Sequence, residues 1–341
     1  LIFGFADLVI VNTCSVRGKA EDKALGKLGL LCASKRERPG RVIGVMGCMA
    51  QRLGLSLFDR VPALDFAVGT RRCGAIPRLV ARALAGETRL HDISAPDETP
   101  DVPDAHADSG FAAFVTVLLG CDRRCAYCIV PDVRGPEFSR PAREVVAEVA
   151  ALARHGVREV TLLGQSVMRY GLANPAWGPA DPASPGGFTE PFPRLLEAVA
   201  AVPGLLRVRF TSGHPSGCTA ELVRALRDLP QLCAHLHLPV QSGSDAVLAR
   251  MRRGYTRADY LEAAHALRAA RPGFALTTDV IVGFPGETPE DFELTRSLMA
   301  EADFDNAFIF KYSPRPGTPA ADWPDDVPAA EKARRNQVLL E

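Results

Sequence analysis

Two apolar segments near the start of the chain, at residues 7–13 (DLVIVNT) and 41–46 (RVIGVM), are short and rich in β-branched residues. Such runs predict buried strands. The segment between them, 16–35, carries Ala, Leu, Lys and Glu at helical spacing, so the three segments predict a strand, helix, strand unit with parallel strands. Cys14 and Cys48 directly follow the predicted strands, where open parallel sheets bind their ligands.

The second part of the chain alternates strand-like and helix-like patterns. Apolar residues at helical spacing predict amphipathic helices, for example at 142–154, 220–227 and 257–270. The strand-like runs are 111–119, 159–163, 207–211, 235–239, 276–282 and 307–311. Six strands alternating with helices predict an α/β fold with a partial (β/α)6 barrel, and the active site of such a barrel lies at the carboxyl ends of the strands.

Composition breaks between these two parts. Residues 92–110 hold six acidic residues, three prolines and hardly any large apolar side chain, which predicts an exposed linker. We therefore expect an N-terminal open parallel-sheet α/β domain at 1–91, a linker at 92–110 and a barrel at 111–341. A Pro/Gly-rich insertion at 172–190 is typical of a lid or surface loop.

Charge and hydropathy narrow the class of protein. The 341 residues include 40 Lys+Arg and 40 Asp+Glu, which excludes a nucleic-acid-binding protein that depends on a global positive field. A local basic surface remains open, because residues 1–100 carry 15 Lys/Arg against 10 Asp/Glu. No run of 18 apolar residues occurs, and the start lacks the basic region and cleavage site of a signal peptide. We expect a cytoplasmic location and no membrane contact.

Three of the nine cysteines, Cys121, Cys125 and Cys128, directly follow the first predicted barrel strand. Thiolates at spacings of four and three in one loop can converge on one metal centre. Three ligands satisfy three irons of a 4Fe-4S cluster and leave the fourth iron open. The alternative is a structural zinc site, which normally needs a fourth ligand and usually two C-x-x-C pairs.

The C-x-x-x-C-x-aromatic-C segment at the end of a barrel strand resembles the signature of the radical S-adenosylmethionine (SAM) superfamily. Other segments resemble the methylthiotransferases of that superfamily, most closely the tRNA-modifying, MiaB-like branch, over nearly the whole chain. These segments are 11–17 (VNTCSVR), 47–52 (GCMAQR), 237–244 (HLPVQSGS), 253–256 (RGYT) and 312–318 (YSPRPGT). The resemblance implies that SAM binds the open iron and is cleaved by one electron to a 5′-deoxyadenosyl radical.

The resemblance also implies a second, auxiliary 4Fe-4S cluster, with Cys14 and Cys48 as two of its three ligands. In the family the third ligand stands in a Gly-Cys-Gln-Met-Asn-like motif upstream of the first, and no such motif occurs in this sequence. The family's C-terminal TRAM domain is likewise absent. We therefore interpret the chain as part of a longer protein. Cys32, late in a predicted amphipathic helix, is typical of a small buried apolar residue.

The resemblance further assigns residues around SAM. Tyr127 is expected near the adenine, and the turn after the second barrel strand near the methionyl portion. The expected cofactor-binding set comprises Tyr127, Gly164, Gln165, Gln241, Ser242, Gly283 and Glu287. Arg134 and Arg140 leave the cysteine loop and can pair bidentately with a carboxylate or phosphate of the substrate, with a structural ion pair as the alternative for each.

The implied reaction converts N6-isopentenyladenosine beside the anticodon of tRNA to its 2-methylthio derivative. One SAM supplies the methyl group and a second supplies the radical, with an electron donor such as flavodoxin or ferredoxin and a monomeric enzyme. Two alternatives within the same chemistry act on an aspartate of a ribosomal protein or on threonylcarbamoyl-adenosine in tRNA. An alternative from another class is a non-catalytic, zinc-containing RNA-binding protein.

Overall fold

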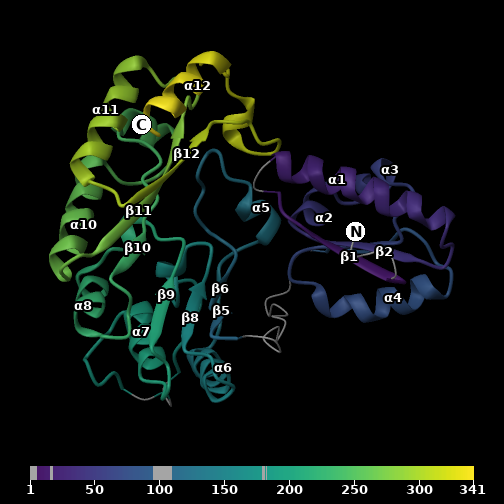
Figure 1. Cartoon of the computed structure of the whole chain (residues 1–341), viewed down its shortest axis with the longest axis horizontal. Helices are drawn as coiled ribbons and strands as arrows, with labels where there is room; N and C mark the ends of the chain where they lie inside the picture. The colour runs from purple at the N-terminus through teal and green to yellow at the C-terminus, as the bar shows by residue number, and fades with distance from the viewer. Residues whose placement is uncertain (1–5, 16–17, 95–109, 179–180, 182) are drawn as a thin grey trace. The chain divides into compact units, whose positions relative to one another are not determined.

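The computed structural model describes residues 6–15, 18–94, 110–178, 181 and 183–341 (Figure 1). These residues form two compact units. The first unit holds the N-terminal segment together with Gly120–Asp122 and Cys128–Pro136, and the second holds the rest. Most of the predicted linker 92–110 lies outside the described residues. Among the residues that are described, no helix combines the length and apolar character needed to cross a membrane.

A parallel four-stranded sheet organises the first unit. Its strands, in spatial order, are β1 (Leu8–Thr13), β2 (Val42–Gly47), β3 (Phe66–Val68) and β4 (Leu90–Asp92). The helices of this unit are α1 (Gly18–Ala33), α2 (Cys48–Leu53), α3 (Ser56–Arg60), α4 (Ile76–Leu84) and α5 (Val130–Arg134). The predicted strand, helix, strand unit is confirmed as β1, α1 and β2, with parallel strands.

Apolar side chains cover both faces of this sheet. Ile43 and Val45 pack with Leu28 of α1, whereas Val42 packs with Leu79 of α4. A parallel sheet buried on both faces explains why its strands read as continuous apolar runs rather than as alternating ones. Asp92, the first residue of the predicted linker, is the last residue of β4.

Six parallel strands form the second unit. They fall into two sheets, β5 (Ala112–Thr116), β8 (Glu159–Leu163) and β9 (Arg207–Phe210), then β10 (His235–His237), β11 (Ala275–Val282) and β12 (Asn306–Lys311). A single parallel bridge between Val208 and Leu232 continues the hydrogen bonding beyond β9. A short antiparallel pair, β6 (Leu118–Leu119) and β7 (Phe138–Ser139), flanks the cysteine loop. All six predicted barrel strands are therefore present.

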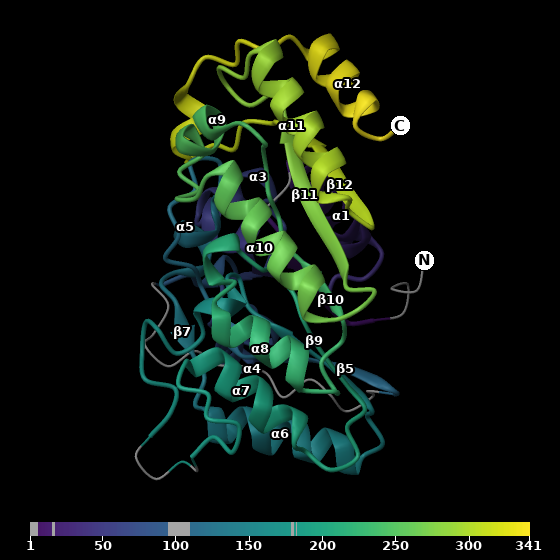
Figure 2. The same ribbon diagram turned by 90° about the vertical axis from the view of Figure 1, so that its left-hand side faces the viewer.

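Helices line the outer side of these strands, as the ribbon shows in two views (Figures 1 and 2). They are α6 (Ala142–Arg154), α7 (Pro191–Ala200), α8 (Ala220–Asp228), α9 (Asp245–Arg250), α10 (Arg257–Ala270), α11 (Pro289–Ala302) and α12 (Ala329–Val338). Short 3-10 helices span Ser34–Arg36, Cys73–Ala75, Val167–Arg169, Pro215–Gly217 and Pro319–Asp322. Strand β11 alternates strictly between buried and partly exposed residues, because one face packs on these helices.

Candidate functional site

The cysteine loop between β6 and α5 carries the three predicted cluster ligands. Cys121 and Cys125 are each 8% exposed, and Cys128 is partly exposed. Gly120 has φ +71°, and a Cβ there would lie 2.0 Å from the carbonyl oxygen of Pro136, so only glycine fits. The Cys121 N–H donates to the carbonyl of Gly135 at 3.1 Å. The backbone at the start of the loop is thereby fixed.

All nine cysteine side chains are thiols in this structure. Among the described residues no three His, Cys, Asp or Glu side chains lie close enough together to hold one metal ion. In a 4Fe-4S cluster each cysteine binds a different iron, so the ligands need not surround a single ion. Two buried thiols and one partly exposed thiol in the same loop match the donor chemistry of such a cluster.

Arg253 is a site residue to which the sequence analysis gave no role. It is 8% exposed, and its Nη1 donates to the Sγ of Cys125 at 3.3 Å and to the hydroxyl of Tyr127 at 3.5 Å. Its Nε donates to the hydroxyl of Tyr255 at 3.1 Å, and no carboxylate of the described residues pairs with it. Burial lowers the pKa of Arg253, but Tyr127, Tyr255 and Cys125 outweigh it and raise that pKa well above the ordinary value. Segment 253–256 already matched the family in sequence, but the sequence did not show that the Arg253 side chain is buried.

An aromatic cluster supports the other side of the loop. The ring of Tyr127 meets Phe284 edge-on with centroids 6.3 Å apart, and Phe284 meets Tyr312 at 5.1 Å. The backbone of Ala126 donates to Met251 at 3.0 Å and accepts from Ala320 at 2.8 Å. Apolar and hydrogen-bonding contacts therefore hold this part of the loop without involving a cysteine side chain.

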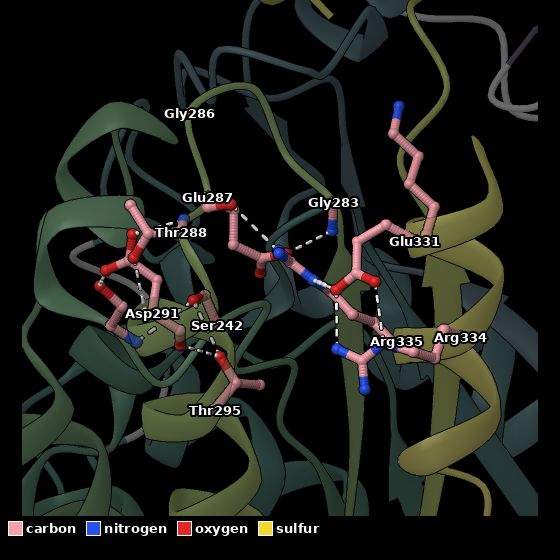
Figure 3. A network of polar contacts seen from close by, with 12 residues as sticks. Ser242, Gly283, Gly286, Glu287, Thr288, Asp291, Thr295, Glu331, Arg334 and Arg335 are labelled. Carbon is pink, nitrogen blue, oxygen red and sulfur yellow. Dashed lines mark hydrogen bonds and ion pairs between the residues drawn. The ribbon is translucent and has the colours of Figure 1, made fainter. Parts of the chain in front are cut away.

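The turn after β11 is held by a buried ion pair (Figure 3). The Oε2 of Glu287 accepts from the Gly283 N–H and from the Nη1 of Arg335, each at 2.6 Å. The side chains of Glu287 and Arg335 are 0% and 3% exposed, and Arg335 also pairs with Glu331 at 2.8 Å. Burial raises the pKa of Glu287, although the Arg335 cation opposes the shift. The structure thus uses the Glu287 carboxylate to hold the turn.

Gly283 itself needs to be glycine. Its φ is +69°, and a Cβ at this position would lie 2.3 Å from the Cγ of Lys332 on α12. The turn therefore brings backbone, rather than side chain, to the carboxyl end of β11.

The remaining predicted cofactor-binding residues lie at the ends of β8 and β10. Gly164 is packed so closely that a Cβ would lie 3.1 Å from the Cβ of Leu118, and Gln165 beside it is partly exposed. Gln241 is 7% exposed with φ +70°, and both its backbone N–H and its carbonyl oxygen are hydrogen-bonded to β11. The hydroxyl of Ser242 is buried and hydrogen-bonded to Thr295 at 3.2 Å, so it serves the packing of α11.

Cys14 and Cys48 leave the first unit's sheet at the same edge. The last paired residues of β1 and β2 are Thr13 and Gly47, and each cysteine follows directly. Gly47 has φ +94°, and a Cβ there would lie 2.6 Å from the carbonyl oxygen of Thr13. Cys14 is exposed and Cys48 is 3% exposed. Both cysteines therefore follow the carboxyl ends of neighbouring parallel strands, the edge at which open α/β sheets bind their ligands.

The two arginines predicted to contact substrate have different surroundings. Arg134 lies in the first unit, where its Nε donates to the Sγ of Cys48 at 3.4 Å. Arg140 pairs with Glu148 at 2.7 Å and donates to the carbonyl of Thr116 at 2.7 Å. The Arg140 contacts correspond to the structural ion pair that the sequence left open.

Three histidines of the second unit are hydrogen-bonded within the fold. His214 is buried, its Nδ1 contacts the hydroxyl of Ser216 at 2.9 Å, and burial with the nearby Arg253 cation lowers its pKa to about 2. His235 and His237 share the hydroxyl of Thr277, at 3.3 and 3.0 Å.

Sequence comparison places the chain among known proteins. The radical SAM superfamily matches residues 115–299, and uncharacterized protein family UPF0004 matches residues 3–69. A protein of Akkermansia muciniphila named tRNA-2-methylthio-N(6)-dimethylallyladenosine synthase is 46% identical over 98% of this chain and 75% of the relative. A protein of the same name from Geobacter sulfurreducens is 48% identical over 97% of this chain and 72% of the relative.

Solved structures share the fold at low identity. The radical SAM methyltransferase TsrM from Kitasatospora setae, solved with cobalamin and a 4Fe-4S cluster bound, gives a TM-score of 0.68 at 16% identity, covering 92% of this chain and 66% of that one. The cobalamin-dependent SAM radical enzyme OxsB gives 0.58 at 12% identity, covering 98% and 47%. These likenesses concern the fold.

Proposed function

Because the chain belongs to the tRNA-2-methylthio-N(6)-dimethylallyladenosine synthase family of radical SAM enzymes, we propose that it converts N6-isopentenyladenosine beside the anticodon of tRNA to its 2-methylthio derivative. The observation that carries the proposal is the identity of 46% and 48% to two relatives of this name over nearly the whole chain. The family uses SAM and 4Fe-4S clusters.

Cys121, Cys125 and Cys128 would hold the radical SAM cluster, and Cys14 and Cys48 would contribute to the auxiliary cluster. When bound, the first cluster supplies the electron that cleaves SAM. Radical chemistry suits this reaction, since no acid or base removes a hydrogen from an unactivated carbon at neutral pH. The shielding of Cys121 and Cys125 supports the assignment, because a reactive cluster must be kept from water.

Arg253 would bind the carboxylate of SAM. A buried guanidinium without a carboxylate partner is costly, and a hydrogen-bonded ion pair with an anionic ligand removes that cost. Tyr127 and Phe284 would pack near the adenine, and the Gly283 turn would offer backbone to it. Gly164, Gln165 and Gln241 would complete the site, with Ser242 and Glu287 holding its loops.

The protein's share of the catalysis is to hold SAM and the substrate base in line within a site shielded from water. The base has to leave its stack to reach such a site, as is usual in recognition of RNA loops. We also propose a flavodoxin or ferredoxin as electron donor, a monomeric enzyme in the cytoplasm, and the domain boundaries 1–91, 92–110 and 111–341.

Nucleoside mass spectrometry tests the function. A host that lacks its own enzyme is complemented with this protein, and its tRNA nucleosides are analysed. We expect the 2-methylthio derivative of N6-isopentenyladenosine to appear with the parent chain and to be absent with Cys125→Ala. Cys233→Ala, a matched variant of a half-buried cysteine outside the loop, should retain the product. Unmodified tRNA together with a methylthiolated ribosomal-protein aspartate would instead assign the enzyme to the related branch.

A further inference from the structure

The sheet of β10, β11 and β12 has two faces of different chemistry. On one face Leu236, Leu276 and Val280 pack into the core beneath α10 and α11, which lie along one side of these strands (Figures 1 and 2). Successive residues of a strand alternate between its faces, so His237 and Asp279 lie on the other face. Their side chains are 20% and 27% exposed.

His237 connects several side chains on this polar face. Its Nε2 lies 3.4 Å from the Oδ2 of Asp279, and its Nδ1 contacts the hydroxyl of Thr277 at 3.0 Å. Phe308 on β12 is in register with Asp279, and its ring meets the His237 ring edge-on, with centroids 6.1 Å apart. We call these four residues, from three adjacent strands, the His237 group.

Two members of the His237 group are open to a ligand. The ring of Phe308 is 53% exposed, although its strand is paired along this segment. Among the residues that the structure describes, no hydrogen bond reaches the Oδ1 of Asp279. An aromatic ring and a carboxylate acceptor therefore stand side by side on adjacent strands. Together they can stack a planar ring and accept a hydrogen bond from its edge.

A short series of contacts joins the His237 group to the cysteine loop. Pro239 follows His237 by two residues, and its carbonyl accepts from the Nη2 of Arg253 at 3.3 Å. The Nη1 of the same arginine donates to the Sγ of Cys125 at 3.3 Å. The His237 group is thereby connected to a ligand of the proposed radical SAM cluster.

We propose that the His237 group binds the adenine base of the substrate, which stacks on Phe308 and donates its N6–H to the Oδ1 of Asp279. The inference rests on the proposed function and names residues that recognise its substrate. Proteins commonly hold unstacked RNA bases by aromatic stacking and by hydrogen bonds to the base edge. N6-isopentenyladenosine keeps one hydrogen on N6, so the donor is present. A substrate aspartate would meet Asp279 as a like charge, which favours the base over the protein substrate of the related branch.

Binding of short RNAs tests the proposal without turnover. The probes are two fluorescein-labelled anticodon stem-loops of one sequence, the first with N6-isopentenyladenosine beside the anticodon and the second with an abasic site there. Fluorescence anisotropy with the full chain, in the absence of reductant, gives the dissociation constant of each. The ratio of the two constants reports contacts with the base, because both RNAs offer the same phosphates.

In Phe308→Ala we expect the affinity for the isopentenyladenosine stem-loop to fall roughly fivefold to a hundredfold, the range for the loss of one base stack. Asp279→Ala should lower the same affinity roughly tenfold, as for a hydrogen bond to a charged group. Neither variant should change the affinity for the abasic stem-loop. Phe111→Ala removes a ring of similar exposure, 52%, outside the His237 group and should bind both RNAs as the parent does.

The results that overturn the inference are distinguishable. If the parent chain binds the two stem-loops equally, it does not recognise this base, and the proposed substrate fails together with the inference. If the parent prefers the isopentenyladenosine stem-loop and both variants keep that preference, only the role of the His237 group fails. An equal loss of affinity for both RNAs would show that the side chains support the fold and do not bind the base.

Discussion

Two buried arginines of the second unit lie in opposite electrostatic surroundings. Arg335, 3% exposed, donates to the carboxylates of Glu287 and Glu331. Arg253, 8% exposed, donates to a sulfur, two phenols and a backbone carbonyl, and no carboxylate of the described part of the chain pairs with it. The protein itself neutralises the first region, whereas the second retains a positive charge.

The difference distinguishes an arginine that stabilises the fold from an arginine of the candidate site. A buried cation is costly unless an anion joins it, so an arginine without a carboxylate marks where an anionic ligand fits. An arginine paired with two carboxylates has no such need. From the sequence we expected Glu287 to bind the cofactor, and we assigned no role to Arg253.

The largest effect on stability is expected at the ion pair of Arg335 with Glu287, where the protein supplies both charges. Arg335→Met leaves the Glu287 carboxylate buried and unpaired, which should lower the free energy of unfolding by about 3–5 kcal/mol. Adding Glu287→Gln removes the stranded charge and should restore much of the loss. Urea unfolding measures both. Arg334→Met, which breaks an exposed pair with Glu331, is the control and should cost less than about 1 kcal/mol. Equal losses of stability in Arg335→Met and Arg334→Met would contradict the difference between the buried and the exposed pair.

A smaller effect is expected at the unpaired arginine, and it should appear in binding rather than in stability. Arg253→Met should weaken SAM binding by roughly tenfold to a hundredfold, the range for a hydrogen-bonded charge pair. Equilibrium dialysis against SAM measures this in reconstituted protein, with the iron content reported alongside. Arg252→Met changes an exposed neighbour and should bind as the parent does. An unchanged affinity of Arg253→Met for SAM, with iron retained, would show that Arg253 contacts Cys125 but does not bind SAM.

The smallest effect is expected in the pH dependence of stability at Glu331. Hydrogen bonds from Arg334 and Arg335 lower the pKa of Glu331 from 4.5 to about 2. A carboxyl whose folded pKa is depressed stabilises the fold above its unfolded pKa and loses that contribution as pH falls through the folded value. Glu331→Gln should therefore melt below the parent at pH 7, and the gap should narrow between about pH 4.5 and 2. A gap that stays constant down to pH 2 would contradict the pairing.

The regular elements were predictable because local sequence determines them. The predicted helices 142–154 and 257–270 have the bounds of α6 and α10. The start of α10 is fixed by a capping box between Thr256 and Asp259, which are only three positions apart on the chain. Strands β3 and β4 were not anticipated, since three residues each are too short to show a period.

The contacts of the site could not be predicted in the same way. Arg335 and Glu287 are 48 residues apart, Arg253 and Cys125 are 128 apart, and Arg134 and Cys48 are 86 apart. A sequence shows which charges exist, but burial and tertiary approach decide which of them meet. The cysteine spacing gave the donor set, and the resemblance gave the cofactor, but neither specified the cation beside the sulfur.

The backbone of Ala126 bears on how metal enters the protein. Because Met251 and Ala320 bond it from two sides, part of the conformational freedom of the cysteine loop is lost when the second unit folds. Iron and sulfide then meet a loop that is already shaped in part, so that less of their binding free energy is spent on ordering the chain.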